Sequence, residues 1–375
     1  MNYNEIFSED VGSFFRSPVR EIFKKVDLNS IYSFAGGYPS AETFPLEEIR
    51  KTMSEVIDKY AGKAFQYGAT QGVPELREAV AKRYGVTVDR VQITSSSQQG
   101  IDVCTRVLVN PGDVILTSNP SYLGAIQSFC SYRADIRGIA HDDDLDTFRR
   151  SYESAIEAAE NEGKKIKFLY MIPDFQNPSG ESLTLEERKM LVSLAQKHGF
   201  LIVEDSPYRE LRYEGEHIPT MYSLAPDHVI HLGSFSKIFA PGFRLGWAIA
   251  HPDLLDKIYV CKQSLDLCPP IFDQYVAAEF LSSGRLDANL EKSIELYKGK
   301  RDMLLGLLEE NMPEGFDAVG FYDKSLDAGV AYVAGEFFHP DRSGKNTMRL
   351  NFSFMSPERI TEGIRLLARL LNTYL

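Results

Sequence analysis

The sequence predicts an α/β fold: a large domain whose mostly parallel, mixed sheet is sandwiched by helices, followed by a smaller α+β domain. Three observations lead to this prediction. Short apolar runs alternate with helical patterns from about residue 91 to residue 250. Polar residues end several of these runs, and after about Cys268 the pattern changes to long helices with few strands. The chain has 375 residues, which is long for a single core.

The first part of the chain supplies the strands of the large domain. Between two of them, Thr184-Leu185-Glu186-Glu187 is a capping box that begins a helix, and Gly199 lies where that helix should end. Alternating strands and helices favour a largely parallel sheet, and ligands of such sheets bind beyond the carboxyl ends of the strands. Asp205 and Ser234 both lie at such ends. The predicted strands are Val91–Thr94, Val114–Thr117, Phe168–Ile172, Leu201–Asp205, Val229–Ser234 and Leu245–Ala250.

The last hundred residues have a different pattern. Residues 273–309 are expected to be mainly helical, with short strands at 330–333 and 348–352. A final helix begins at Ser356-Pro357, where a capping residue precedes proline in the first turn. Short strands beside helices indicate a small α+β domain.

Composition excludes several classes of protein. Apolar residues make up 43% and charged residues 25% of the chain, as in ordinary globular proteins, and the net charge of −12 argues against a general nucleic-acid or membrane-surface binder. The four cysteines form no Cys-x-x-Cys pair, and no metalloprotease or other metal-site motif occurs. We find no signal peptide and no apolar stretch near the roughly 20 residues that cross a membrane. A cytoplasmic location without membrane, nucleic-acid or metal ligands is therefore expected.

The most informative stretch runs from Gly233 to Trp247 and places an amine, two hydroxyls and a guanidinium in one loop after a strand. The amine of Lys237 can condense with an aldehyde to form a Schiff base. The hydroxyls of Ser234 and Ser236 and the guanidinium of Arg244 can hold a phosphate. Pyridoxal phosphate carries both groups. A bare Ser-x-x-Lys is more often a solvated surface charge, so the full run carries the argument.

Asp205 ends the apolar strand Leu201–Asp205. A buried carboxylate costs free energy unless it has a cationic partner, and the protonated ring nitrogen of pyridoxal phosphate is such a partner. At ~4 Å and an effective dielectric constant of about 20, the attraction is roughly 4 kcal/mol. The alternative is that Asp205 caps a turn that includes Tyr208. Taken alone the two are equally plausible; Lys237 further along the chain favours the cofactor.

A second anion site is expected after the strand Val91–Thr94. Ser96-Ser97-Gln98-Gln99-Gly100 opens a helical stretch there, and free amides at a helix start bind anions. An ordinary polar helix start is the alternative for Ser97 alone.

Together these motifs resemble fold-type I pyridoxal-phosphate-dependent aminotransferases, in the branch with 2-aminoadipate, kynurenine and aromatic amino acid aminotransferases. The resemblance runs from about Ser17 to the C-terminus. It implies a homodimer with shared active sites. It also implies an N-terminal segment 1–45 that packs with the small domain, a cofactor-binding domain at 46–275 and a small domain at 276–375.

The resemblance assigns roles on the cofactor residue by residue. Tyr208 and Asn177 meet the ring 3-oxygen, although Asn177-Pro178 is also a plain turn signal. Tyr122 stacks on the ring, and Tyr67 reaches the phosphate of the neighbouring subunit. The phosphate of the same subunit is held by Ser97, Gln98, Ser234, Ser236 and Arg244. Where relatives often carry glycine, this chain has Ser96.

The substrate is also assigned residues by the resemblance. Arg349, in Thr347-Met348-Arg349-Leu350, matches the arginine that grips the substrate α-carboxylate, which a guanidinium can bind through two hydrogen bonds. Gly37 brings backbone close to the same carboxylate. Arg20 aligns with a position that meets a side-chain carboxylate in 2-aminoadipate enzymes, although a solvated arginine is equally plausible there.

One departure interrupts the resemblance. Relatives carry a Gly-Gly-aromatic strand after the long helix that ends near Met312, and here the chain passes directly to Pro313. Either the protein has lost this strand, or residues are missing from the sequence at this point. We favour missing residues, because losing a strand would expose the apolar faces of its neighbours. An intact mass that agrees with 42.3 kDa would reject that interpretation.

Three functions remain open on the residues alone. The first is an aminotransferase that moves an amino group from an L-amino acid to a 2-oxo acid, 2-oxoglutarate by expectation, in a ping-pong cycle. The second is a lyase or decarboxylase that uses the same cofactor, because cofactor motifs do not separate these reactions. The third is a sensing domain of the kind fused to winged-helix regulators, disfavoured by the acidic charge and the roughly thirty residues before Phe34-Ala35-Gly36-Gly37. Aromatic, branched, 2-aminoadipate and kynurenine donors are all expected candidates.

Overall fold

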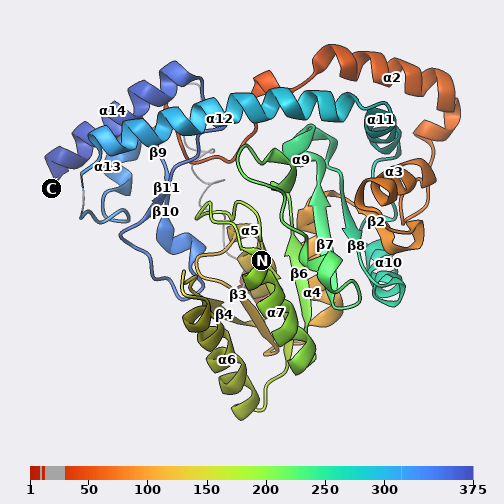
Figure 1. Ribbon diagram of the computed structural model, residues 1–375, viewed down its shortest axis with the longest axis horizontal. Helices are drawn as coiled ribbons and strands as arrows, with labels where there is room; N and C mark the ends of the chain where they lie inside the picture. Colours follow the sequence, from red (N-terminus) through yellow and green to blue (C-terminus); the bar gives the residue numbers. More distant parts are fainter. Residues whose placement is uncertain (9–10, 13–29, 314, 375) are drawn as a thin grey trace.

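The computed structural model describes residues 1–8, 11–12, 30–313 and 315–374. Within these residues, a large α/β part surrounds a central sheet and a smaller part gathers the C-terminal helices (Figure 1). The strands of the central sheet are β2 (Val91–Thr94), β3 (Val114–Ser118), β4 (Asp135–Ile139), β5 (Ile166–Met171), β6 (Leu201–Asp205), β7 (Val229–Ser234) and β8 (Gly246–Ile249). Their spatial order is β2-β8-β7-β6-β5-β3-β4. β8 is antiparallel to both neighbours and the other pairs are parallel, which confirms the predicted mixed sheet.

Alternating side chains of the strands enter two separate cores, one on each face of the sheet. Ile115 and Leu116 are successive residues of β3, and they belong to different hydrophobic clusters. Helices cover both faces of the sheet, so the side chains on both faces are apolar. The strands are therefore continuous apolar runs in the sequence. The α-helices of the described residues are α2 (Leu46–Tyr60), α3 (Pro74–Tyr84), α4 (Ser96–Leu108), α5 (Leu123–Ser131), α6 (Leu145–Asn161), α7 (Leu185–His198), α8 (Met221–Leu224), α9 (Phe235–Ile238), α10 (Pro252–Asp266), α11 (Ile271–Ser282), α12 (Arg285–Asn311), α13 (Tyr322–Asp327) and α14 (Pro357–Tyr374).

Helix α7 begins and ends as the sequence predicts. Thr184 Oγ1 accepts the amide of Glu187 at 3.2 Å, and Glu187 Oε2 accepts the amide of Thr184 at 2.6 Å, which completes the capping box. Gly199 ends the helix with φ of 70°. Such left-handed backbone is cheap for glycine and costly for most residues.

The smaller part contains two short sheets under α12 and α14. β1 (Tyr32–Ser33) runs parallel to β9 (Val330–Ala331), and β10 (Val333–Ala334) is antiparallel to β11 (Met348–Arg349). Helix α12 crosses from the large part to the small part (Figure 1). β1 therefore brings residues just before the Gly36-Gly37 loop into the small part, and β11 brings Arg349.

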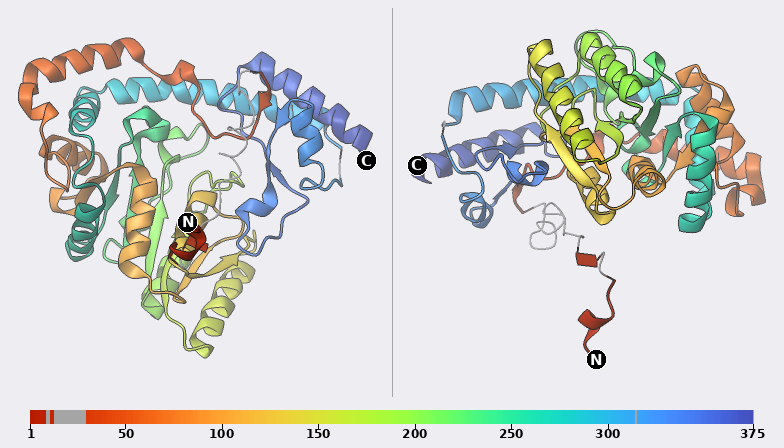
Figure 2. Two further views of the ribbon diagram at one scale, coloured as in Figure 1. Left: turned by 180° about the vertical axis from the view of Figure 1, so that it is seen from behind. Right: turned by 90° about the horizontal axis from the view of Figure 1, so that it is seen from below.

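The first residues lie away from this body. Residues 1–8 extend outward in Figure 2, and the aromatic rings of Tyr3 and Phe7 are exposed. None of the helices in the described ranges has both the length and the apolar character needed to cross a membrane.

Candidate active site

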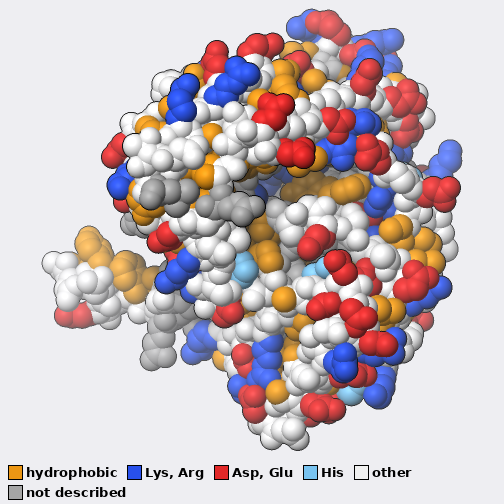
Figure 3. Space-filling view, turned by 60° about the vertical axis from the view of Figure 1, so that its left-hand side comes forward, with side chains coloured by type: hydrophobic (Ala, Val, Ile, Leu, Met, Phe, Trp, Pro, Cys, Tyr) orange, Lys and Arg blue, Asp and Glu red, His pale blue; other side chains and the backbone are white. Residues whose placement is uncertain are grey.

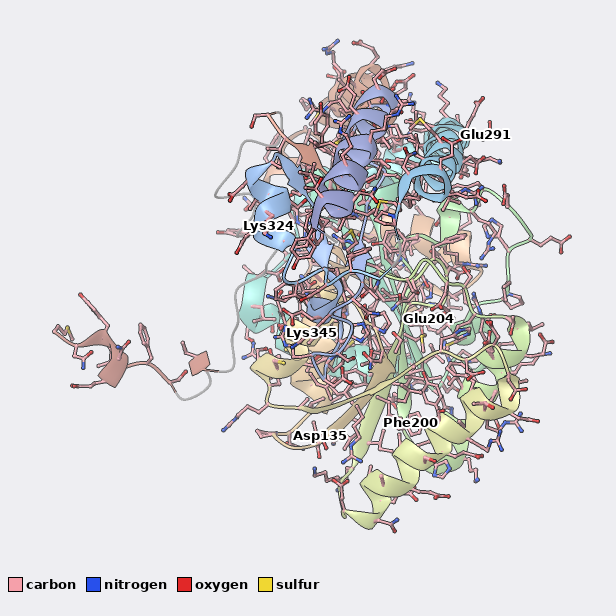
Figure 4. The ribbon with its side chains drawn as sticks, turned by 90° about the vertical axis from the view of Figure 1, so that its left-hand side faces the viewer. Asp135, Phe200, Glu204, Glu291, Lys324 and Lys345 are labelled. Atoms are coloured by element: carbon pink, nitrogen blue, oxygen red, sulfur yellow. The ribbon has the colours of Figure 1, made fainter. Side chains whose placement is uncertain are left out.

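The carboxyl ends of the parallel strands face the small part of the molecule. Figure 4 shows Phe200, just before β6, toward the bottom of the large part, whereas Glu204 lies higher, toward the part that carries Lys324 and Lys345. The surface is hollowed between the two parts in the space-filling view (Figure 3). Asp205, at the end of β6, therefore lies at the sheet edge nearest the small part.

Lys237 reaches from the end of β7 to the loop after β1. It lies in α9, the short helix that begins directly after Ser234. Its Nζ donates a hydrogen bond to the carbonyl of Gly37 at 2.6 Å. Burial lowers the pKa of this amine to about 8, with help from the charges of Arg349 and Arg244. At pH 7 roughly a tenth of an amine with this pKa is neutral, far more than for an ordinary lysine, and the neutral form is the one that acts as nucleophile or general base.

Asp205 is 1% exposed, and only half of its carboxylate is satisfied. Oδ2 accepts a hydrogen bond from the hydroxyl of Tyr170 at 2.8 Å, whereas Oδ1 is buried without a hydrogen-bond partner. Burial raises the pKa of Asp205 to about 6, against the opposing effects of the Tyr170 hydrogen bond and of a weaker polar contact with the side chain of Ser97. Buried carboxylate oxygens without a hydrogen-bond partner are rare in proteins, so this one indicates a site for a ligand that donates a hydrogen bond. A protonated ring nitrogen would satisfy it, so the residues fit pyridoxal phosphate.

The start of α4 and the Arg244 loop meet at the other end of the site. Ser96 has a φ of 65°, and its Oγ accepts a hydrogen bond from Nη2 of Arg244 at 2.7 Å. Ser97 and Gln98 follow in the first turn of α4, where free amides and the helix dipole attract anions. Ser234 Oγ, nearby in the chain, accepts the amide of Ser236 at 3.1 Å. The left-handed backbone at Ser96 explains why glycine suits this position.

Gln98 and Tyr122 contact one another. The hydroxyl of Tyr122 donates to Oε1 of Gln98 at 3.1 Å, and Nε2 of Gln98 donates to the carbonyl of Gly124 at 3.0 Å. A Cβ added to Gly124 would lie 2.6 Å from the Tyr122 ring, so the ring packs closely over the start of α5. The side chain of Gln98 is thus used to hold Tyr122, and its backbone amide is the group suited to an anion.

Arg349 and Asn177 meet across the two parts of the molecule. Nη1 of Arg349 donates to Oδ1 of Asn177 at 3.0 Å, Nη2 donates to the carbonyl of Ala35, and Nε is buried without a partner. A hydrogen-bonding contact with Asn177 also involves Tyr208, whose pKa is raised by burial. The unpartnered Nε is a donor that a substrate carboxylate could use.

Two predicted residues are not brought to this site within one chain. The side chain of Tyr67 is 79% exposed, which suits contact with another copy. Arg20 lies outside the described residues, so its predicted role stays a prediction. Over the described ranges, no three His, Cys, Asp or Glu side chains gather as metal ligands do.

The sequence reasoning missed Tyr170. It lies on β5, beside β6, and is fully buried. A tyrosine inside an apolar strand signals a hydroxyl that needs a partner, and a carboxylate at the end of the adjacent strand supplies one. The strand pairing that joins them could not be read from the sequence pattern.

Comparison with known proteins gives a consistent result. The Aminotransferase class I and II family model matches residues 34–367. The aromatic-amino-acid aminotransferase 1 of Thermococcus litoralis is 42% identical, with 98% of this chain and 94% of that protein covered. The alignment spans 397 positions, so the relative carries residues without counterparts among the 375 of this chain.

Two solved structures are similar over nearly their whole length. The kynurenine aminotransferase of Pyrococcus horikoshii, solved with PMP, is 38% identical with a TM-score of 0.93, covering 100% of this chain and 98% of its own. The α-aminoadipate aminotransferase LysN of Thermus thermophilus, solved with N-(5'-phosphopyridoxyl)-L-leucine, is 33% identical with a TM-score of 0.90, covering 100% and 99%.

Proposed function

The chain belongs to the class I and II aminotransferases, and on that premise we propose that it transfers the amino group of aromatic L-amino acids to 2-oxoglutarate in a ping-pong cycle. It is a pyridoxal-phosphate-dependent aminotransferase. The observation that carries the proposed site is the buried Asp205 with its unpartnered Oδ1, in one site with a Lys237 amine of lowered pKa. Aromatic donors are supported by what the similar proteins are named for.

The cofactor residues follow from that anchor. When bound, the cofactor acts as an electron sink for the substrate Cα. Asp205 holds the ring nitrogen in its protonated form, which sustains that property. Lys237 would tether the aldehyde carbon and, once released, would carry the proton from the substrate Cα to the carbon that had been the aldehyde carbon, as general base and then general acid. Asn177 and Tyr208 hold the 3-oxygen, and Tyr122 stacks on the ring.

The phosphate would be held by several hydrogen-bond donors acting together. These are the first amides of α4 at Ser97 and Gln98, the hydroxyls of Ser234 and Ser236, and the guanidinium of Arg244. The contact between Arg244 and Ser96 supports this placement, because it fixes the cation beside the helix start. Charge-assisted bonds of this kind are about twice as strong as neutral ones.

The substrate carboxylate is proposed to bind Arg349 beside Asn177 and Gly37. The buried Nε of Arg349 supports this role, since it lacks a protein partner. Arg20 stays a candidate for a side-chain carboxylate of the substrate.

The assembly is proposed to be a homodimer in the cytoplasm. The exposed Tyr67 supports a shared active site, because a tyrosine that reaches another subunit must project from its own. Thiols that are all free in the described structure suit a reducing compartment.

A panel of amino donors with 2-oxoglutarate tests the function. Aromatic donors should give glutamate and the matching keto acid, with parallel double-reciprocal lines when both substrates are varied. No glutamate from any donor would point to a lyase instead. Glutamate from 2-aminoadipate alone would keep the reaction class and overturn the donor proposal.

A further inference from the structure

The turn that precedes α4 is held by a carboxylate from another helix. Asp266, the last residue of α10, accepts hydrogen bonds at Oδ2 from Ser95 Oγ at 3.1 Å and from Gln99 Nε2 at 2.7 Å. Oδ1 of the same group accepts Nζ of Lys262 at 2.7 Å. Three donors therefore converge on one carboxylate.

Gln99 links this carboxylate back to the turn. Its Oε1 accepts the amide of Ser95 at 2.8 Å, while its Nε2 donates to Asp266. Two polar groups of Ser95, the amide and the hydroxyl, are thus held by this network. The next residue, Ser96, is the one with a φ of 65° and with its hydroxyl on Arg244.

Left-handed backbone in a non-glycine residue costs free energy and persists only where its surroundings hold it. The side chain of Ser95 does not cap α4, so the first amides of the helix are not closed off by it. The network therefore fixes the turn while leaving the helix start open to an anion.

Lys262 neutralises the charge of Asp266, which would otherwise repel a phosphate bound nearby. Its side chain is 0% exposed and pairs with Asp266, whose side chain is 24% exposed. A lone carboxylate near a phosphate would repel it, whereas an ion pair is close to neutral at a distance. The pair thus lends hydrogen-bond acceptors to the turn without adding net charge.

We propose that Asp266 is a positioning residue that sets the Ser95–Ser96 turn and, through it, the affinity of α4 and Arg244 for the cofactor phosphate. This inference rests on the proposed placement of the phosphate at the start of α4. Asp266 does not touch the cofactor; it acts through Ser95 and Gln99.

The test removes the ion pair as a unit, because deleting one partner would strand a buried charge. The double variant Lys262→Met with Asp266→Leu keeps the net charge. Apoprotein is titrated with pyridoxal phosphate and, separately, with pyridoxal, which lacks the phosphate, and binding is followed by absorbance. We expect the dissociation constant for pyridoxal phosphate to rise about tenfold, as for lost charged hydrogen bonds, with that for pyridoxal unchanged.

The matched control is an ion pair elsewhere on α10. Asp256 and Lys257 are 2.9 Å apart and mostly exposed, so Asp256→Leu with Lys257→Met should leave both constants unchanged. Should the first variant not fold, Ser95→Ala removes a single bond and should raise the pyridoxal phosphate constant by about threefold.

The possible results separate the two claims. Equal weakening for pyridoxal and pyridoxal phosphate, or no weakening for either, overturns the role of Asp266. If Arg244→Ala and Ser236→Ala also leave the preference for pyridoxal phosphate over pyridoxal unchanged, the phosphate placement itself is wrong. If those two variants reduce the preference and the Asp266 variants do not, only the positioning role fails.

Discussion

At the scale of single residues, the site combines the amine of Lys237 and the carboxyl group of Asp205. Burial shifts the pKa of each group in the direction that favours its neutral form. Lys237 has its pKa lowered to about 8 and Asp205 has its pKa raised to about 6. Each shift opposes the charge that an isolated group would carry at neutral pH. Binding of the cofactor would offset the free-energy cost of burying ionised Asp205, because the protonated ring nitrogen would be a cationic partner for the unpartnered oxygen.

The pKa of Lys237 predicts the pH dependence of cofactor uptake. Only the neutral amine attacks an aldehyde, so the rate of uptake by apoprotein should rise with pH and level off above about 8. Stopped-flow absorbance measures this rate. A rate that keeps rising steeply to pH 10 would indicate an ordinary lysine.

Asp205→Asn should affect apoprotein and holoenzyme in opposite directions. The folded pKa of about 6 is above the unfolded value of 3.8, so the folded apoprotein holds the proton more tightly. Its free energy of unfolding therefore falls as pH rises from about 4 to about 6, by roughly 3 kcal/mol in all. Above pH 6 the variant apoprotein should be the more stable, while its affinity for pyridoxal phosphate should be lower. Chemical denaturation measures the difference, which should vanish near pH 4.

At the scale of elements, the site depends on how closely β8 approaches the start of α4. A Cβ added to Gly246 would lie 2.6 Å from the carbonyl oxygen of Gly233 and 2.7 Å from the backbone of Ser96. Only glycine permits this approach, and it sets the place of the Ser96 turn beside Arg244.

Gly246→Ala should therefore lower the free energy of unfolding by about 1–3 kcal/mol and weaken cofactor binding. Gly242→Ala is the matched control, because a Cβ there would meet nothing within 4 Å. Thermal unfolding and cofactor titration measure both effects. Equal behaviour of the two variants would contradict the close packing.

Most helices and strands were predictable from the sequence, whereas the contacts between residues of different elements were less so. The capping box at Thr184 and the end of α7 at Gly199 are local signals, and both were confirmed. The partners of Asp205 and Arg349 were not predictable, because Tyr170 and Ala35 reach them through strand pairing and the junction of the two parts. The edge strand β4 was missed because its Asp135-Ile136-Arg137-Gly138 run is polar.

At the scale of the whole molecule, the described residues of the small part close over one another without the Gly-Gly-aromatic strand expected from the resemblance. Val330, Tyr332 and Val333 are at most 1% exposed in the described structure. The exposed neighbours that we expected from a lost strand are therefore not observed. An intact mass that agrees with 42.3 kDa would show that no residues are missing between Met312 and Pro313.

The exposed Tyr67 predicts that a complete site needs two chains. Light scattering should give twice the 42.3 kDa of one chain. Tyr67→Phe should weaken pyridoxal phosphate binding by about tenfold through one lost hydrogen bond to a charged group. Tyr3→Phe alters another exposed tyrosine and should have no effect. A monomer that retains the cofactor at full affinity would contradict the shared site.

The tether at Lys237 is the claim on which the other roles depend. Holoenzyme reduced with borohydride, digested and analysed by mass spectrometry should carry a phosphopyridoxyl group on the peptide that contains Lys237, and the Lys237→Ala variant should carry none. A reduced protein whose Lys237 peptide is unmodified, or a label on another lysine, would contradict the account.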